Sequence, residues 1–252
     1  MPIVGVINQK GGVGKTTTAV NLSAGLARKR RVLLVDLDPQ ANATSGLGIE
    51  RPERTIYDVL VGEVSARHAA VRTKTANLSL LPASADLAGA AVELDASTDD
   101  LMLLDKALIG VRPAYDFIVV DAPPSMGALT LNALAAADQL IVPLQTEYYA
   151  LEGIAGMMDT VERVRGSLNP DLRILGILLT MADARTNLSR QVEDNVRSHF
   201  GSQVFHTVIP RNVRLAEAPS HGAPIFDYAI ESQGALAYRA LAEEVLLRVS
   251  EG

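Results

Sequence analysis

The chain has 252 residues, of which 48% are hydrophobic and 21% are charged, and it is long enough to bury a substantial core. The absence of cysteine excludes disulfides, thiolate metal sites and cysteine-ligated clusters, and the lack of a signal peptide or a long apolar run leads us to expect a cytoplasmic protein without a membrane partner. The formal net charge of −6 argues against a nucleic-acid partner when taken alone, but the total can hide a local basic region.

Short apolar runs alternate with stretches of helical periodicity along the chain. We expect strands at residues 3–7, 31–36, 78–81, 115–121, 139–142, 173–180 and 204–209. We expect helices at residues 19–27, 56–60, 64–71, 86–94, 100–109, 129–136, 151–164, 188–200 and 234–249, and a loop at 41–54, which is rich in Gly, Asn, Ser and Thr. This alternation predicts an α/β fold: one domain over residues 1–252, with a doubly wound, mostly parallel sheet and helices on both faces.

The segment between the first strand and the first helix, residues 9–18, reads Gln-Lys-Gly-Gly-Val-Gly-Lys-Thr-Thr-Thr. Glycines let successive backbone N–H groups turn round an anion, and the helix N-terminus adds partial positive charge. Lys15 would reach the β- and γ-phosphates, and the Thr16 hydroxyl would hold Mg²⁺. The full candidate cradle comprises Gly11, Gly12, Val13, Gly14, Lys15, Thr16 and Thr17. A glycine-rich turn without a ligand is the alternative, and the flanking strand and helix argue against it.

This loop departs from the usual G-x-x-x-x-G-K-[ST] pattern, because Gln9 stands where the first glycine is expected and Lys10 adds a second lysine. Residues 10–16 resemble the signature of the deviant Walker A ATPases, a group that contains the ParA, MinD and nitrogenase iron protein families. The resemblance implies that Lys10 crosses a dimer interface and reaches the nucleotide of the partner.

Three aspartates follow predicted strands, at the sheet edge where ligands bind in such folds. Asp121 ends an apolar run, as in a Walker B strand, and would bind Mg²⁺, although it could instead cap the next segment. Asp36 and Asp38 lie two residues apart, so in an extended chain both side chains would point toward one edge of the site. One of them could join the outer shell of the metal while the other orients water. The resemblance implies that Asp38 positions the attacking water and that Asp36 supports it.

Several longer stretches narrow the resemblance to chromosomal ParA proteins of the Soj type. These stretches are residues 35–48, 121–125, 147–153, 180–188 and 208–220. The resemblance covers nearly the whole chain. It implies a slow Mg²⁺-dependent ATPase in which an ATP-bound homodimer binds double-stranded DNA without sequence preference and is released after hydrolysis stimulated by ParB. Such a protein would be associated with the nucleoid.

The resemblance also assigns residues outside the loop. Arg185 and Arg214 match the DNA-binding arginines, while Pro210 and Asn212 match a loop that contacts adenine. Residues 161–216 contain eight arginines against five acidic residues, which favours a local basic region, although each arginine could instead be a surface residue in an ion pair. The chain begins only a few residues before the first strand, so we expect no helix-turn-helix extension and no sequence-specific DNA binding.

Other members of the group are less compatible with this sequence. Iron proteins and arsenite pumps depend on cysteines, which are absent. A MinD-like protein would need a basic amphipathic tail, whereas residues 235–252 carry alanines, acidic residues and only two arginines. A bacterial tyrosine kinase of similar fold would need a tyrosine-rich tail. A metabolic P-loop ligase remains the alternative from a different functional class.

Overall fold

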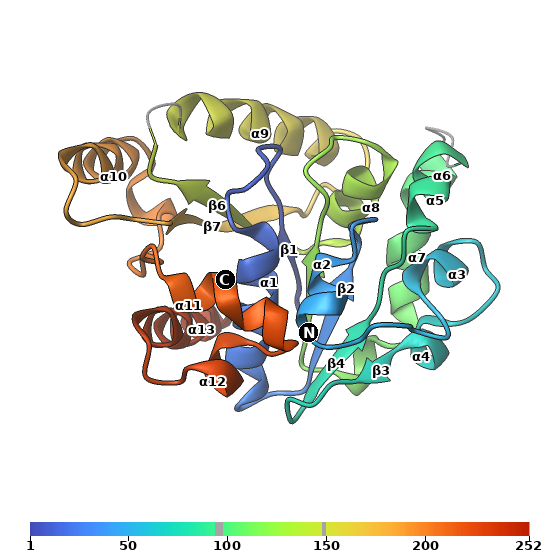
Figure 1. Ribbon diagram of the computed structural model, residues 1–252. Helices are drawn as coiled ribbons and strands as arrows, with labels where there is room; N and C mark the ends of the chain where they lie inside the picture. The colour runs from blue at the N-terminus through green and yellow to red at the C-terminus, as the bar shows by residue number, and fades with distance from the viewer. Residues whose placement is uncertain (94–97, 148–149, 252) are drawn as a thin grey trace.

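The computed structural model describes residues 1–93, 98–147 and 150–251 and contains a seven-stranded sheet between two layers of helices (Figure 1). The strand order is β3-β4-β2-β5-β1-β6-β7, and all neighbours are parallel except β3 and β4. The doubly wound, mostly parallel architecture predicted from the sequence is therefore confirmed. The strands are β1 (Ile3–Val6), β2 (Val32–Asp36), β3 (Val71–Arg72), β4 (Leu78–Leu81), β5 (Phe117–Asp121), β6 (Gln139–Gln145) and β7 (Arg173–Thr180).

Helices cover both faces of the sheet, and each face has its own hydrophobic cluster. The first face is covered by α3 (Ile56–Leu60), α4 (Ala66–Ala69), α5 (Leu87–Glu93), α6 (Thr98–Leu101), α7 (Leu103–Ile109), α8 (Ala128–Ala136), α9 (Ala150–Arg165) and α10 (Asn187–Phe200). The second face is covered by α1 (Lys15–Ala27), α2 (Asn42–Gly46), α11 (Val213–Glu217), α12 (Ile225–Tyr228) and α13 (Gln233–Glu251). Short 3-10 turns occupy Arg112–Ala114, Gly201–Gln203 and Ala218–His221. None of the described helices is long and apolar enough to cross a membrane.

The central strands are buried along their whole length, as expected for parallel strands covered on both faces. Their register aligns the carboxyl ends: Asp121 of β5 lies opposite Asp36 of β2 on one side and Val6 of β1 on the other. The segments that follow β1, β2 and β5 therefore leave the sheet side by side.

Helix α1 connects this edge of the sheet to the opposite one. It begins directly after the glycine loop, and all of its residues from Thr18 to Ala27 are buried. The Thr18 hydroxyl lies 3.2 Å from the buried Tyr238 hydroxyl of α13. This packing fixes the start of α1, and with it the loop.

Four sequence predictions were wrong in detail. The helix expected at 64–71 is shorter, because α4 ends at Ala69 and Val71 belongs to β3. Residues 41–54 are not all loop, because α2 lies within them. Residues 204–209 form no strand: they make an isolated bridge between Val204 and Ile177, and the Ile209 N–H donates to the Leu179 carbonyl at 2.9 Å. The helix expected at 100–109 is interrupted at Met102, where the side chain of Asn132 from α8 accepts from the Leu104 N–H and donates to the Asp100 carbonyl. Residue 94 of the expected helix 86–94, and residues 148–149 of the 147–153 motif, lie outside the described residues.

Candidate active site

The glycine loop between β1 and α1 has the conformation that its sequence requires. Gly12 and Gly14 have φ angles of 74° and 87°, in the left-handed region where side chains are strained. A Cβ atom built on Gly11 or Gly12 would meet no other atom within 4 Å, so the loop faces open space. The loop therefore presents its backbone toward a space that a ligand can enter, at the N-terminus of a 13-residue helix.

Lys15 lies within this loop and is only 7% exposed. Its ammonium group donates to the Lys10 carbonyl oxygen at 3.0 Å. Burial lowers the pKa of Lys15, while the charges of Asp121 and Asp38 act in the opposite direction. The lysine predicted to bind phosphate is therefore in electrostatic contact with two of the predicted carboxylates.

Asp121 is the most unusual charged group of the site, because it is fully buried and neither carboxylate oxygen has a hydrogen-bond partner within the described residues. Burial is the main reason that its pKa rises well above the ordinary value, and the nearby charge of Asp36 adds to the rise. The Thr16 hydroxyl and Lys15 lower this pKa in part. Two unpaired buried oxygens beside a hydroxyl fit a hard divalent cation such as Mg²⁺.

No group of three or more His, Asp or Glu side chains among the described residues could enclose a metal. The protein therefore offers Asp121 and the Thr16 hydroxyl, and the remaining ligands would be water and phosphate oxygens, as is usual for Mg²⁺.

Asp36 and Asp38 have different surroundings. Asp36 Oδ2 accepts from the backbone N–H and the hydroxyl of Thr44 at 2.8 and 2.7 Å, and Oδ1 accepts from the Asp38 N–H at 3.2 Å. The Thr44 hydroxyl in turn accepts from the Ala83 N–H at 2.9 Å. Burial raises the pKa of Asp36 to about 6. Through these hydrogen bonds, Asp36 holds α2 and the segment that follows β4 beside the site.

Asp38 uses only one oxygen in the described structure: Oδ1 accepts from the Gln40 N–H at 2.9 Å. Its side chain is held by this turn and is 6% exposed, and its Oδ2 atom makes no hydrogen bond with the described residues. A held carboxylate with one oxygen left over can orient a water molecule.

The two residues that make the loop deviant both contact the β6–α9 region. Gln9 donates to the Thr160 hydroxyl of α9 at 3.3 Å. Lys10 forms an ion pair with Glu147 at 3.3 Å, and the two side chains are 42% and 49% exposed. Lys10 therefore points away from the phosphate cradle of its own chain and is accessible at the surface.

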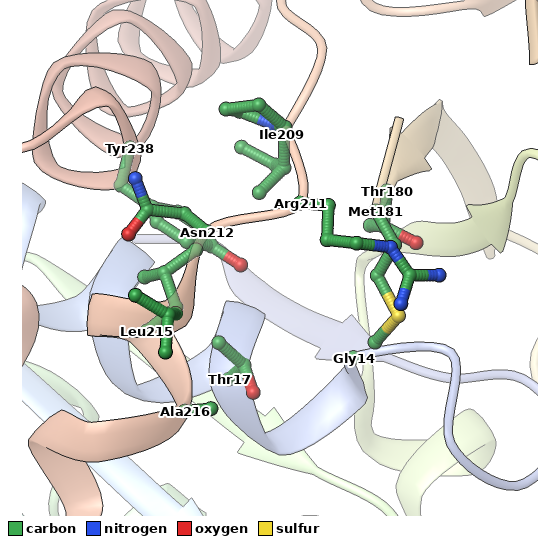
Figure 2. Close-up of a pocket in the computed structure, with 12 residues that line it drawn as sticks. Gly14, Thr17, Thr180, Met181, Ile209, Arg211, Asn212, Leu215, Ala216 and Tyr238 are labelled. Carbon is green, nitrogen blue, oxygen red and sulfur yellow. The ribbon is translucent and has the colours of Figure 1, made fainter. Parts of the chain in front are cut away.

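A pocket of about 360 Å³ adjoins the loop and is lined mainly by apolar groups (Figure 2). Thr17 and Gly14 form its floor, and Ile209, Asn212 and Leu215 lie across from them in Figure 2. The remaining lining residues are Thr180, Met181, Pro210, Arg211, Val213, Ala216 and Tyr238. Its size and its position beside the phosphate loop suit the base and ribose of a nucleotide.

The structure brings Pro210 and Asn212 to this pocket, and their contact with adenine stays a prediction. Sequence reasoning missed Thr180, Met181 and Tyr238. Thr180 at the end of β7 donates to the Val13 carbonyl of the loop at 2.9 Å. For Thr180 and Met181, the signal in the sequence was their position at the end of an apolar strand. Tyr238 reaches the pocket because α13 packs beside it, which no local sequence pattern reveals.

Arg185 and Arg214 lie outside the pocket, and both are ion-paired. Arg185 makes a two-bond contact with Asp183, with Nε–Oδ1 at 2.9 Å and Nη2–Oδ2 at 2.8 Å, and its side chain is 87% exposed. Arg214 Nη1 lies 2.9 Å from Glu217 Oε2, and its side chain is 54% exposed. The ion-pair alternative raised by the sequence is thus present at both positions, yet both guanidinium groups face solvent.

A phosphate loop, a buried carboxylate suited to Mg²⁺ and an adjoining base pocket together define a Mg²⁺-dependent P-loop ATPase. A sequence family described as an AAA domain matches residues 1–174. The solved structure of cobyrinic acid a,c-diamide synthase from Mycobacterium smegmatis with bound ATP analog and magnesium superposes with a TM-score of 0.87 at 39% identity, covering 100% of this chain and 96% of that chain.

Two curated relatives identify the family within this class of ATPases. The chromosome-partitioning ATPase Soj of Thermus thermophilus is 57% identical over 98% of this chain and 96% of its own length. The chromosome partitioning protein ParA of Caulobacter vibrioides is 51% identical over 98% of this chain and 94% of its own length. The chain belongs to the ParA/Soj family of partitioning ATPases, as the sequence motifs indicated, and its cofactors are ATP or ADP and Mg²⁺.

Proposed function

We propose that this ATPase is a DNA-attachment switch in chromosome partitioning. ATP assembles two copies into a dimer, the dimer binds double-stranded DNA without sequence preference, and hydrolysis stimulated by a ParB-type partner releases it. The family membership supports this role. The observation that supports this role most strongly concerns the two segments that bear Arg185 and Arg214. Residues of both segments line the pocket beside the phosphate loop.

The two segments are joined at the pocket itself. Ala182 pairs with Pro210 in an isolated parallel bridge, in which the Ala182 N–H donates to the Ile209 carbonyl at 3.1 Å and the Arg211 N–H donates to the Ala182 carbonyl at 2.9 Å. Met181, which lines the pocket, has a φ angle of 53° and is therefore held in an unusual conformation. A nucleotide that fills the pocket would press on this junction and act on both arginines together.

Asn212 links the pocket to Arg214 in a second way. It lines the pocket, and its side-chain oxygen accepts from the Arg214 N–H at 2.9 Å, which caps α11. Arginine contacts to phosphate position DNA without reading bases, as a protein that binds anywhere on a chromosome requires.

Hydrolysis in this proposal relies on positioning and charge neutralisation. The Thr16 hydroxyl and Asp121 would hold Mg²⁺, which would neutralise charge on the β- and γ-phosphates. Lys15 would release the Lys10 carbonyl and bind the phosphates, and Asp38 would orient the attacking water. Asp36 would act through its bonds to Thr44, as a positioning group. Lys10 would reach the nucleotide of the second copy.

The test is fluorescence anisotropy with a random-sequence DNA duplex, in the presence of ATP, ADP or no nucleotide. We expect tight binding only with ATP, and a loss of at least about 100-fold in affinity for the Arg185→Glu, Arg214→Glu double variant. Asp183→Asn should strengthen binding, because the guanidinium of Arg185 would no longer have to leave a charged partner. Equal binding in ATP and ADP, or full binding by the double variant, would refute the switch.

An ATP-dependent amide ligase is the second candidate, and the match to a synthase at 39% identity is the observation that favours it. A ligase would hydrolyse ATP in response to a small acid substrate and would be indifferent to DNA and to a ParB-type protein. Measuring ATP turnover with DNA plus the cognate ParB-type protein separates the two: stimulation supports the switch, and none supports the ligase.

A further inference from the structure

A second polar hollow lies at the far end of α1 from the phosphate loop, beside the amino ends of β2 and β4. Its volume is about 510 Å³, and its walls are residues 72–73 and 75–79 together with Arg31, Ala114 and Tyr115. Since α1 has 13 residues and rises about 1.5 Å per residue, roughly 20 Å separate this hollow from the loop. The hollow is therefore separate from the nucleotide site.

The turn between β3 and β4 that forms most of the hollow is firmly held. Asn77 adopts a left-handed conformation with φ 61° and donates from its side chain to the Ala27 carbonyl at the end of α1, at 3.2 Å. The Asn77 carbonyl accepts from the Val32 N–H at 2.9 Å. In Figure 1 this turn lies beside the end of α1 at the bottom of the view. The hollow is thus preformed.

The lining is cationic and carries unused donors. None of the described residues that line it has a carboxylate, as is also true of the nucleotide pocket. Within the described residues, the side chains of Arg72, Ser79 and Tyr115 make no hydrogen bond, so a guanidinium and two hydroxyls are available there. Arg31 is held by Asp116 through Nη2 at 2.9 Å and Nε at 3.3 Å, which fixes its direction and leaves other N–H groups free.

More cations lie next to the lining residues along the chain. Arg28, Lys29 and Arg30 precede Arg31 in the chain and are all exposed, and Lys74 is exposed on the facing turn. Of these four, within the described residues, only Lys29 has a carboxylate within ion-pair distance, at 3.9 Å from Glu243. Two carboxylates contact the lining from outside it, Asp116 through Arg31 at 2.9 Å and Asp227 through the Thr75 hydroxyl at 2.6 Å, and the neighbouring cations outnumber them, so this end of the molecule carries a local excess of positive charge.

We propose that the hollow is a second phosphate-binding site. In this site Arg72 would face a phosphate group with its planar fork of N–H donors, Ser79 and Tyr115 would add hydroxyl donors, and Arg31, whose charge is paired with Asp116, would add its remaining N–H donors. The ligand is a phosphate-bearing anion, either a free oligophosphate compound or a phosphate of the DNA backbone. The site does not depend on ATP, because it shares no residue with the nucleotide pocket.

The test is calorimetric titration with inorganic tripolyphosphate, without Mg²⁺, on a Lys15→Ala variant in which the phosphate loop is disabled. We expect one remaining site per chain. Adding Arg72→Glu should weaken it at least tenfold, whereas the matched control Lys106→Glu, an exposed cation on α7, should leave it unchanged. The proposal is overturned if the Lys15→Ala variant binds no tripolyphosphate, or if Arg72→Glu binds it as well as its parent does.

A competition experiment identifies the source of the phosphate. If a random-sequence DNA duplex displaces tripolyphosphate from the Lys15→Ala variant, and Arg72→Glu removes that competition, the site holds the DNA backbone. If the duplex does not compete while tripolyphosphate still depends on Arg72, the site holds a free phosphorylated compound. Arg72→Glu alone should leave ATP turnover unchanged, which separates failure of this site from failure of the proposed switch.

Discussion

Asp36 and Asp121 are neighbours in the register of β2 and β5, and both carboxyl groups are removed from water. Burial raises both pKa values, that of Asp36 to about 6; the charge of Asp36 raises the pKa of Asp121 further, and the charge of Asp38 raises both. A carboxyl group whose pKa is higher in the folded than in the unfolded chain holds more protons when folded. Its contribution to stability is therefore present at low pH and is lost as the pH rises from about 4 to about 6.

The first prediction concerns Asp121→Asn in the nucleotide-free protein. Removing this unpaired buried carboxylate should raise the free energy of unfolding by on the order of 1–3 kcal/mol. For a chain of this size, that gain corresponds to a rise of about 2–10 °C in Tm at neutral pH. Because the raised pKa of Asp121 makes the folded chain lose stability as the pH rises above the ordinary carboxyl range, the variant should also lose part of that decrease in stability. Thermal unfolding followed by circular dichroism measures both effects.

Two controls accompany this prediction. Asp116→Asn should bring no gain in Tm, because Asp116 lies at the surface in an ion pair and its pKa is held low, at about 2, by hydrogen bonding to Arg31. Mg²⁺ with ADP should stabilise the wild type far more than Asp121→Asn. If Asp121→Asn melts lower than the wild type without nucleotide, the carboxylate is not the electrostatic liability that its burial indicates.

Asp38 differs from Asp36, whose two oxygens both accept hydrogen bonds, because one of its own oxygens is uncommitted in the described structure, while the other is held by the Gln40 N–H. We expect Asp38→Ala to lower ATP turnover by at least about 100-fold, the usual scale for a lost general base or water-orienting group, while ATP still binds. Asp38→Asn, which can keep the bond from the Gln40 N–H, should be similarly inactive, because the charge is gone. Single-turnover hydrolysis and nucleotide titration give the two readouts, and turnover within twofold of wild type would reassign the water to another residue.

At the scale of elements, helix α11 is the part of the proposed DNA-binding region that is most directly connected to the pocket beside the phosphate loop. Asn212→Ala would remove its cap, at about 1 kcal/mol, and also a polar group of the pocket. We therefore expect a lower Tm together with weaker Mg-ADP binding, measured by calorimetry. The matched control is Thr186→Ala, which removes the cap of α10 but lines no part of the pocket, and which should lower Tm without changing nucleotide affinity. Equal loss of affinity in both variants would mean that the effect is only structural.

The long strands could be predicted from the sequence because they are buried on both faces and therefore appear as continuous apolar runs. The positions of the short elements are set by contacts with residues far away in the sequence. Helix α2 has five residues and begins after Ala41, whose φ angle is 52°; its position is set by the bonds from Thr44 to Asp36. Residues 204–209 looked like a strand by composition, but they touch β7 only at their two ends, through a bridge at Val204 and backbone hydrogen bonds from Phe205 and Ile209. In both places the deciding contacts come from elsewhere in the chain, so no local pattern could reveal them.

The same distinction holds for the site. The loop residues and the three aspartates could be placed from the sequence because each follows a strand, and parallel strands bring their carboxyl ends to one edge. The base pocket could not be derived in this way. It depends on Thr180 at the end of β7, on the segment 209–216 and on Tyr238 of α13, which meet only when the helix layer packs.

At the scale of the whole molecule, Lys10 connects the single chain to the proposed dimer. In the chain described here it is paired with Glu147 and directed away from its own phosphate cradle. An exposed pair of this kind contributes at most about 1 kcal/mol, so a phosphate on a second copy can readily replace it. Formation of an ATP-bound dimer would then exchange one partner of Lys10 for another without unfolding any element.

This exchange gives the last prediction. Lys10→Ala should bind ATP but remain a monomer in gel filtration with light scattering, whereas the wild type shifts to a dimer with ATP and returns to a monomer with ADP. Glu147→Gln is the matched variant, because it removes the partner of Lys10 within the chain and keeps the lysine itself. It should dimerise at least as well as the wild type, since the lysine no longer has to leave a carboxylate. An ATP-dependent dimer of Lys10→Ala with wild-type affinity would exclude a role for this lysine across the interface, and failure of Glu147→Gln to dimerise would show that Glu147 belongs to the interface itself.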